Sequence, residues 1–289
     1  MVNEQNNFSL VLGDIVNAAG GKTGEVVKVS ETELESSTWL LGVQGSGKSS
    51  LIEGLVYQLA CREPKRGLVV VDPHGDLVEN ILKQLPEYRL KDVCLLDILD
   101  HDYFYGVNLF DAKDVEAGGK GVETDRAVDR VVDTFMKIFE GSPRGILLPK
   151  ILRYITRVMI ANPGMTIVDV PRLLEDDDFR SELLGNVTHY WTLKYWHEYG
   201  EMKGRAKGDE TKSLNNRLEQ LLSMGLLEMI MGQEKTTIDF RKAMDKNEII
   251  LIRLVVKDFR EIAPVIGSAL VTEISRAVFS YANVERSKR

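Results

Sequence analysis

The stretch Gly42-Val43-Gln44-Gly45-Ser46-Gly47-Lys48-Ser49 has the spacing of a phosphate-binding loop: a glycine, four further residues and then Gly-Lys-Ser. The apolar residues 39–41 before it predict a short buried strand, and residues 50–60 after it predict a helix with its leucines on one face. A glycine-rich turn between a strand and a helix lets backbone N–H groups close on a polyphosphate, and the helix N-terminus adds the positive end of its dipole. The stretch therefore predicts a nucleotide site.

The side chains of this loop have distinct expected roles. Lys48 is predicted to be catalytic, because its ammonium group would reach the β- and γ-phosphates of ATP. The hydroxyl of Ser49 is predicted to bind Mg²⁺. The residues predicted to contact the nucleotide are Gly42, Val43, Gln44, Gly45, Ser46, Gly47, Lys48, Ser49 and Ser50. The alternative is a glycine turn that carries a lysine by coincidence and binds no nucleotide.

The composition is typical of a soluble protein. The chain has 289 residues, 44% hydrophobic and 28% charged, which suits one large domain or two modest ones. Its net charge of −7 argues against nucleic acid covering the whole surface but allows a local basic channel. Cys61 and Cys94 form no CxxC pattern, which argues against a disulfide scaffold or a zinc site. With no apolar run near 18 residues and no signal-peptide pattern in residues 1–8, the predicted location is cytoplasmic.

Apolar runs further along the chain predict a parallel sheet. Residues 68–72 and 93–97 are continuous apolar stretches, as in buried parallel strands, and residues 77–85 between them predict a helix. With the strand expected before the glycine-rich loop, they give a strand–helix–strand–helix–strand order that is typical of a doubly wound α/β sheet. Residues 9–12 and 25–29 predict two further strands.

The middle of the chain has a different pattern. Residues 122–232 show helical spacing of apolar residues almost throughout, and an apolar strand at 247–256 and a helix at about 261–283 follow. The predicted division is the N-terminal part of an α/β ATPase domain, 1–121, an inserted α-helical subdomain, 122–232, and a return to the sheet, 233–289.

Several stretches resemble the motifs of one family. After the nucleotide loop come Leu68-Val69-Val70-Val71-Asp72-Pro73-His74-Gly75-Asp76-Leu77, Asp92–Asp97 and Gly106–Leu109. Weaker matches in the same order are Leu214–Leu218, Ile238–Phe240 and Ile249–Ile252. Through these motifs nearly the whole chain resembles the FtsK–HerA superfamily of P-loop motor ATPases, and within it the TraG/TraD-like coupling proteins of conjugative DNA transfer and type IV secretion.

The resemblance implies a P-loop NTPase (RecA-like) parallel sheet, ATP and Mg²⁺ as cofactors, and self-association into a ring, usually a hexamer. Such rings pump DNA, or sometimes protein, through a central channel, with secretion or conjugation machinery as partners that recruit them to the inner face of a membrane. The family's Walker B strand, an apolar strand that ends in Asp-Glu, is missing from residues 1–289. We therefore expect the sequence to be the N-terminal portion of a longer protein, and 1–289 alone to hydrolyse ATP weakly or not at all.

Two residues at or just after the end of the predicted strand 68–72 are further candidates. Asp72 ends that strand and is a candidate for catalysis and for binding Mg²⁺. The alternative is a turn carboxylate that caps the next helix. His74, between Pro73 and Gly75, is either a catalytic group or part of a shaped turn.

Candidate contacts with DNA and with a neighbouring subunit lie further along the chain. The run His189–Tyr199 is rich in aromatic rings, which either stack on bases or pack in a helical core. A glycine-bearing stretch is either a solvated loop or a loop that contacts DNA phosphates through Lys203, Arg205, Lys207 and Lys212. The candidate arginine fingers, each of which could instead form a salt bridge, are Arg217, Arg260 and Arg276.

The predicted function is ATP hydrolysis of the motor type, coupled to movement of DNA through a ring. One alternative is a P-loop ATPase that powers protein secretion, and another is a nucleotide-dependent switch or assembly module without turnover. Salt-sensitive DNA binding together with DNA-stimulated ATPase activity would separate the first function from the other two.

Overall fold

The computed structural model describes residues 9–30, 33, 36–112, 121–139, 147–202 and 205–281. The chain divides into two compact units. The first, called the sheet unit, comprises residues 1–97 and 242–253, and the second, called the helical unit, comprises residues 98–241 and 254–289. The predicted domain boundaries, after residues 121 and 232, differ from these divisions and stay a prediction.

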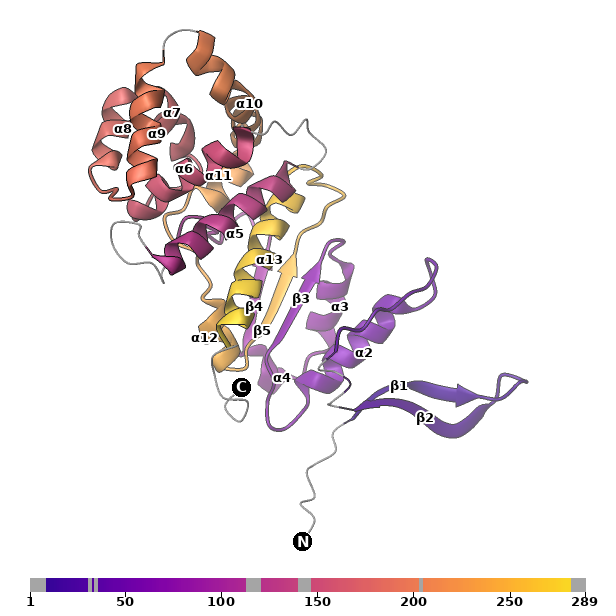
Figure 1. Ribbon diagram of the computed structural model, residues 1–289. Coiled ribbons are helices and arrows are strands. Elements are labelled where there is room, and N and C mark those ends of the chain that lie inside the picture. Colours follow the sequence, from indigo (N-terminus) through magenta and orange to yellow (C-terminus); the bar gives the residue numbers. More distant parts are fainter. Residues whose placement is uncertain are drawn as a thin grey trace. The chain divides into compact units, whose positions relative to one another are not determined.

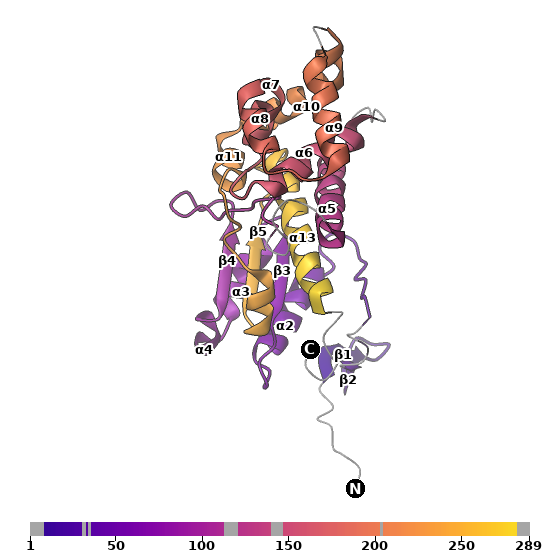
Figure 2. The same cartoon turned by 60° about the vertical axis from the view of Figure 1, so that its left-hand side comes forward.

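Three parallel strands form the centre of the sheet unit (Figures 1 and 2). They lie in the order β3 (Leu68–Asp72), β5 (Ile249–Arg253) and β4 (Val93–Asp97). In the strand register, Asp72 and Asp97 both lie opposite Arg253, so all three strands end at the same edge of the sheet. The four residues from Ile249 to Ile252 are buried, as expected for the middle strand of a parallel sheet. The predicted mixed α/β class and the three parallel strands are confirmed.

Helix α2 (Lys48–Ala60) packs against this sheet through residues four positions apart. Val56 and Ala60 are buried, and the half-buried Ile52 extends the same stripe. Their partners in the core are Val70, Val78, Ile81, Leu85, Ile249 and Leu251. The predicted helix is confirmed, and Leu51, Leu55 and Leu59 lie on one face of it as expected. Those leucines are only half-buried, and the stripe that meets the core lies one residue further along the helix.

The remaining helices near the sheet are short. After β3 the chain forms α3, which buries Val78 and Ile81, and this confirms the helix expected there. The bounds are α3 Asp76–Gln84, α4 Glu87–Leu90 and α12 Phe240–Asp245. Helix α12 ends at Asp245, and residues 246–248 connect it to β5.

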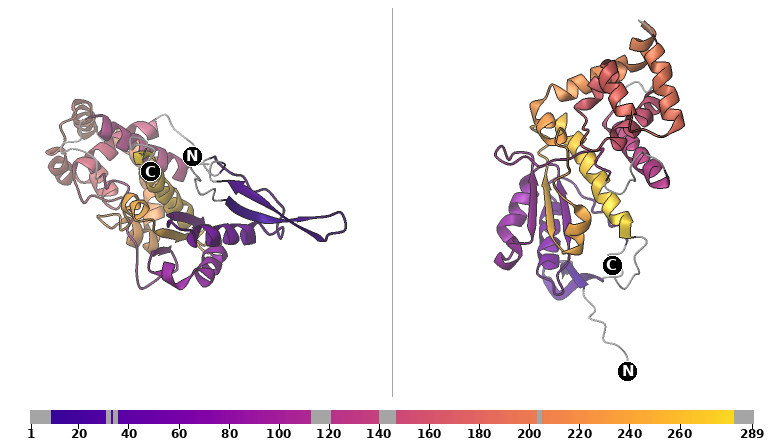
Figure 3. Two further views of the ribbon diagram at one scale, coloured as in Figure 1. Left: turned by 90° about the horizontal axis from the view of Figure 1, so that it is seen from below. Right: turned by 90° about the vertical axis from the view of Figure 1, so that its left-hand side faces the viewer.

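An antiparallel hairpin precedes the glycine-rich loop at residues 42–49 (Figure 3). Strand β1 (Ser9–Val16) pairs with β2 (Lys22–Ser30). The side-chain amide of Gln58, on α2, holds the hairpin by accepting from Val11 N at 2.8 Å and donating to Val11 O at 3.0 Å. Both predicted strands are confirmed, and both extend several residues beyond the predicted ranges.

The strand expected before the nucleotide loop is absent from the described residues. Residues 36–43 form no strand, and Trp39 and Leu41 are each 84% exposed. An apolar segment becomes a strand only where another backbone pairs with it. Neither edge of the described three-stranded sheet pairs with this segment, so that element of the strand–helix–strand prediction is wrong.

The described residues between 121 and 231 contain helices and no strand, which confirms the predicted helical content. The helices are α5 Val122–Ile138, α6 Leu147–Ala161, α7 Asp169–Glu175, α8 Asp177–Leu184, α9 Tyr190–Glu201, α10 Arg205–Leu222 and α11 Gly225–Met231. Two details differ from expectation. The single helix expected over 211–231 is broken at Ser223 and Met224, and the expected loop from 205 to 212 is the start of α10.

A loop after β4 is fixed by hydrogen bonds within the helical unit. The side-chain amide of Asn108, which is 2% exposed, donates to Met165 O at 3.0 Å and to Glu234 O at 2.8 Å. A Cβ at Gly106 would lie 2.4 Å from Lys235 O, so only glycine fits there. The Gly106–Leu109 motif therefore has a structural role in holding this loop.

One described helix, α13 (Ile262–Ser280), is long and apolar enough to cross a membrane by length and composition. The expectation that nothing in the chain spans a membrane stays a prediction. Half of the helix window is buried inside the protein, and it contacts α5 and α11. The core helix of a soluble protein meets the same criterion, so the helix is weak evidence for a membrane.

Candidate nucleotide-binding site

The predicted nucleotide residues form one exposed turn at the start of α2. Gly45 and Gly47 have φ of 80° and 86°, in the left-handed region that favours glycine. The turn is closed by a hydrogen bond from Ser46 N to Val43 O at 3.2 Å. The first helical bond runs from Leu51 N to Gly47 O at 2.9 Å, so the N–H groups just before Leu51 face the turn.

Lys48 lies across this turn. Its Nζ donates to Gly42 O and to Val43 O, at 2.8 Å each. Lys48 is half-buried, whereas the other predicted nucleotide residues are exposed. The ammonium group is therefore held beside the helix N-terminus by two neutral carbonyl groups, and an anion could take their place.

The donors of the turn fit a polyphosphate. The first turn of α2 contains no acidic residue, so its N–H groups, the helix dipole and the Lys48 ammonium all favour an anion. The hydroxyl of Ser49 is an oxygen ligand of the kind that Mg²⁺ prefers. The part of the chain that the structure describes has no group of three or more metal-ligating side chains, so Mg²⁺ would need phosphate oxygens to complete its coordination.

Asp72, at the end of β3, is 2% exposed and caps the turn that follows. Its Oδ1 accepts from His74 N at 2.9 Å, and its Oδ2 accepts from Val78 N, in the first turn of α3, at 3.0 Å. The structure thus supports the alternative of a capping carboxylate. A role in catalysis or in binding Mg²⁺ stays a prediction, as does a catalytic role for the exposed His74.

Arg253 is a charged residue at this edge that the sequence interpretation missed. It ends β5 between Asp72 and Asp97, which end the neighbouring strands. Its Nη1 lies 3.2 Å from Asp97 Oδ2, and its Nη2 lies 3.8 Å from Glu79 Oε2. Ligands of parallel α/β sheets bind outside the carboxyl ends of the strands, where Arg253 lies. The sequence feature that could have identified it is an arginine at the end of an otherwise apolar strand.

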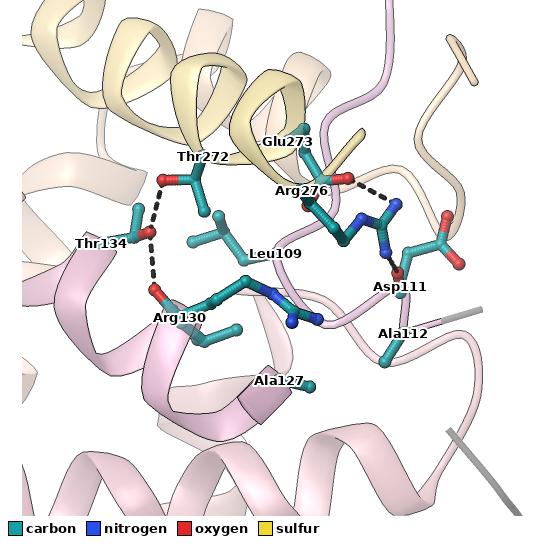
Figure 4. Close-up of a pocket in the computed structure, with 10 residues that line it drawn as sticks. Leu109, Asp111, Ala112, Ala127, Arg130, Thr134, Thr272, Glu273 and Arg276 are labelled. Carbon is teal, nitrogen blue, oxygen red and sulfur yellow. Dashed lines mark hydrogen bonds and ion pairs between the residues drawn. The ribbon is translucent and has the colours of Figure 1, made fainter. Parts of the chain in front are cut away.

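The three candidate arginine fingers occupy two places in the helical unit. Arg276 Nη2 pairs with Glu273 Oε2 at 2.7 Å and Nη1 donates to Asp111 O at 3.4 Å (Figure 4). Arg217 and Arg260 line a different cavity. Arg276 therefore has the salt bridge that was the alternative for each of these residues, and the arginine-finger role stays a prediction.

The aromatic run in α9 contains both buried and exposed rings. Tyr195, Trp196 and Tyr199 are buried, which confirms core packing for these rings. Tyr190 and Trp191 are 65% and 58% exposed and lie edge to face, with centroids 5.2 Å apart. His189 caps the helix through Nδ1, and His197 is exposed on its far end.

The predicted DNA-contacting basic residues are only partly described. Lys203 lies outside the described residues. Arg205 and Lys207 lie in the first turns of α10, where the structure describes the backbone and not the side chains. Lys212, further along the same helix, is exposed. Contact between these residues and DNA stays a prediction.

No family model matches the chain, and no curated protein matches it.

Proposed function

We propose that the protein is an ATP-driven DNA translocase of the conjugative coupling-protein type, which hydrolyses ATP as part of a ring. The observation that carries the proposal is the exposed glycine turn at the N-terminus of α2 with Lys48 Nζ held on its carbonyl oxygens. This combination supplies an ammonium group, backbone N–H donors and a positive helix end to one anion.

The protein's own groups bind and orient the nucleotide. Lys48 would exchange two neutral acceptors for charged phosphate oxygens, and a hydrogen bond between charged groups contributes about 1.5–3 kcal/mol. Ser49 would share in holding Mg²⁺, whose chemistry is to neutralise the charge that develops on the phosphates. Arg253, which pairs with Asp97 at the carboxyl ends of the strands, is a candidate to contact the phosphates through its guanidinium group.

DNA as the moved substrate is supported by the exposed rings of α9. Lys194 Nζ lies 5.3 Å from the Trp191 ring centroid, so a cation accompanies the exposed Tyr190–Trp191 pair. Base stacking on such rings contributes about 1–3 kcal/mol per base and is tolerant of sequence, which suits a translocase. A nearby ammonium group would attract the phosphate backbone.

Steady-state ATPase activity, measured with and without single- and double-stranded DNA, tests the proposal. Lys48→Ala is expected to weaken ATP binding by roughly tenfold to a hundredfold or more, the effect of losing a charged hydrogen bond. Lys83→Ala is the matched control, since it removes a lysine from an exposed pair with Glu79 on α3.

The outcomes separate the candidate functions. DNA-stimulated turnover that depends on Lys48 supports the translocase. Turnover without any response to DNA would favour a secretion ATPase, and ATP binding without turnover would favour a nucleotide-dependent switch. Unchanged ATP affinity in a folded Lys48→Ala protein would remove the nucleotide site itself.

A further inference from the structure

The helical unit contains a cavity of about 300 Å³ that lies between the ends of α5 and α10 and the start of α13. This volume is at the lower end of the range, about 300–1,000 Å³, in which proteins bind small molecules. All lining residues belong to the helical unit, so the cavity is defined by packing within one unit.

Basic side chains line the cavity from three segments. Lys137 lies at the end of α5, Arg217 on α10, and Arg260 just before α13. Among the residues that the structure describes, the one acidic lining residue is Glu261, whose Oε2 accepts from Gln220 Nε2 at 3.3 Å. Three cations against one carboxylate leave an excess of two positive charges, which matches the charge of about −1.5 to −2 on a phosphate monoester at neutral pH.

One side of the wall is apolar. The Arg217 guanidinium carbon lies 5.2 Å from the centroid of the buried Phe139 ring, which holds the guanidinium over a ring face. Leu221 and Val265 complete the apolar side. A bare inorganic anion would leave this side unused, whereas an organic phosphate would place its body on the apolar wall and its charge beside the arginines.

We propose that this cavity binds a small organic phosphate of about mononucleotide size, at a site separate from the turn that contains Lys48. Arginine is suited to this ligand because its planar group donates two parallel hydrogen bonds to phosphate oxygens. The polar groups of Gln220 and Ser268 supply further hydrogen bonds at the cavity wall.

Titration calorimetry of the full chain with adenosine 5′-monophosphate tests this site. The Lys48→Ala variant is the starting protein, so that binding at the first turn is reduced and failure of one proposal is distinguishable from failure of the other. Adenosine and inorganic phosphate are the matched ligands, because each supplies only one half of the probe. We expect one equivalent of the monophosphate to bind, more weakly as salt is raised, and neither half to bind as tightly.

Two kinds of variant locate the site. Arg260→Glu reverses an exposed charge and is expected to weaken binding tenfold or more, the effect of losing a charged hydrogen bond. Ser268→Phe fills the cavity without changing its charge and is expected to abolish binding. Arg126→Glu, on the exposed face of α5 and outside the cavity, is the control and is expected to change affinity less than twofold.

Several results would overturn the proposal. One is no binding to a folded Lys48→Ala protein, and another is binding that neither Arg260→Glu nor Ser268→Phe weakens. If inorganic phosphate bound as tightly as the monophosphate, the apolar wall would contribute nothing to binding. Binding of a thymidine oligonucleotide that depends on Arg260, without binding of the monophosphate, would make the cavity a nucleic-acid contact instead.

Discussion

Arg253 Nη1 lies 3.2 Å from Asp97 Oδ2, where the middle and one outer strand of the parallel sheet end side by side. The two side chains are 25% and 14% exposed, so water shields the pair only in part. The pair lies at the carboxyl edge of the sheet, the edge at which ligands of α/β proteins bind. The pair therefore links the ends of two strands, and it places the charge of Arg253 at the edge where a ligand would bind.

Replacing Arg253 with Met should lower the free energy of unfolding by about 1–2 kcal/mol, because it removes a partly shielded, hydrogen-bonded ion pair while keeping the length of the side chain. Asp97→Asn should have a similar effect. The double variant should be less destabilised than the sum of the single variants, since each removes the same interaction. Chemical denaturation measures all four proteins, and strictly additive effects would show that the pair contributes no coupling energy.

Asp72→Ala should lower the free energy of unfolding by about 1–2 kcal/mol, as expected for loss of a capping carboxylate that accepts from His74 N and Val78 N. Asp72→Asn keeps one acceptor oxygen and should be destabilised less. Thermal unfolding measures both. ATP binding with and without Mg²⁺ is the second readout: a folded Asp72→Asn protein that has lost its response to Mg²⁺ would assign the carboxylate to the metal.

The sequence predicted the elements with strong local signals. Apolar runs identified the three parallel strands, and glycines at 45 and 47 identified the turn that needs positive φ. The segment around Trp39 was predicted wrongly because a strand depends on a partner backbone, which local sequence does not reveal. Arg253 was missed for a related reason, since its neighbours Asp72 and Asp97 come from strands more than 150 residues away in sequence.

The aromatic run shows the same limit. Aromatic residues occur throughout the run, but in the helix Tyr195, Trp196 and Tyr199 are buried in the core, whereas Tyr190 and Trp191 are exposed. The sequence pattern did not decide between base stacking and core packing for any ring of the run. Which rings are buried depends on the helix that packs against one side of α9, and tertiary packing determines that helix. Tyr154 of α6, for example, stacks on Tyr195 with centroids 4.2 Å apart.

Trp191→Ala should leave stability nearly unchanged and weaken binding of single-stranded DNA by about 1–3 kcal/mol, the contribution of one stacked base. Trp196→Ala is the contrast, because that ring is 1% exposed and its removal should destabilise the fold by about 3–5 kcal/mol. Fluorescence anisotropy with a labelled oligonucleotide and thermal unfolding separate the two effects. Unchanged DNA affinity in the Trp191 variant would remove α9 from the DNA surface.

Cys94 should react slowly with iodoacetamide at neutral pH. Burial within β4, with a smaller contribution from the negative charge of Glu248, raises the pKa of its thiol. A raised pKa means less thiolate, and the thiolate is the reacting form. Mass spectrometry after timed alkylation, with the same protein in denaturant as the reference, measures the rate. Equal rates in folded and denatured protein would contradict the expected protection.

The stability of the fold depends on the charge of Asp92, because Asp92 lies beside the buried Arg89. The Arg89 side chain is fully buried, and its Nη2 donates to the backbone oxygens of Arg66 and Asn247 at 3.1 and 3.2 Å, which joins the segments that enter β3 and β5. Its Nη1 lies 3.2 Å from Asp92 Oδ2, which also accepts from Lys65 Nζ at 2.8 Å. A buried guanidinium needs this compensating carboxylate, because a lone buried charge is costly.

The hydrogen bond from Lys65, helped by the charges of Lys65 and Arg89, holds the pKa of the Asp92 carboxyl below its ordinary value. A lowered pKa in the folded protein means that the ionised form stabilises the fold. This stabilisation is fully present above the pKa of the unfolded chain, about 3.9, and is lost as pH falls through the lower folded pKa. Asp92→Asn should therefore lower the free energy of unfolding by about 2 kcal/mol at pH 7 and by progressively less below pH 4. Denaturation of both proteins across this pH range measures the difference, and a difference that stays constant down to pH 2 would show that the carboxylate charge does not stabilise Arg89.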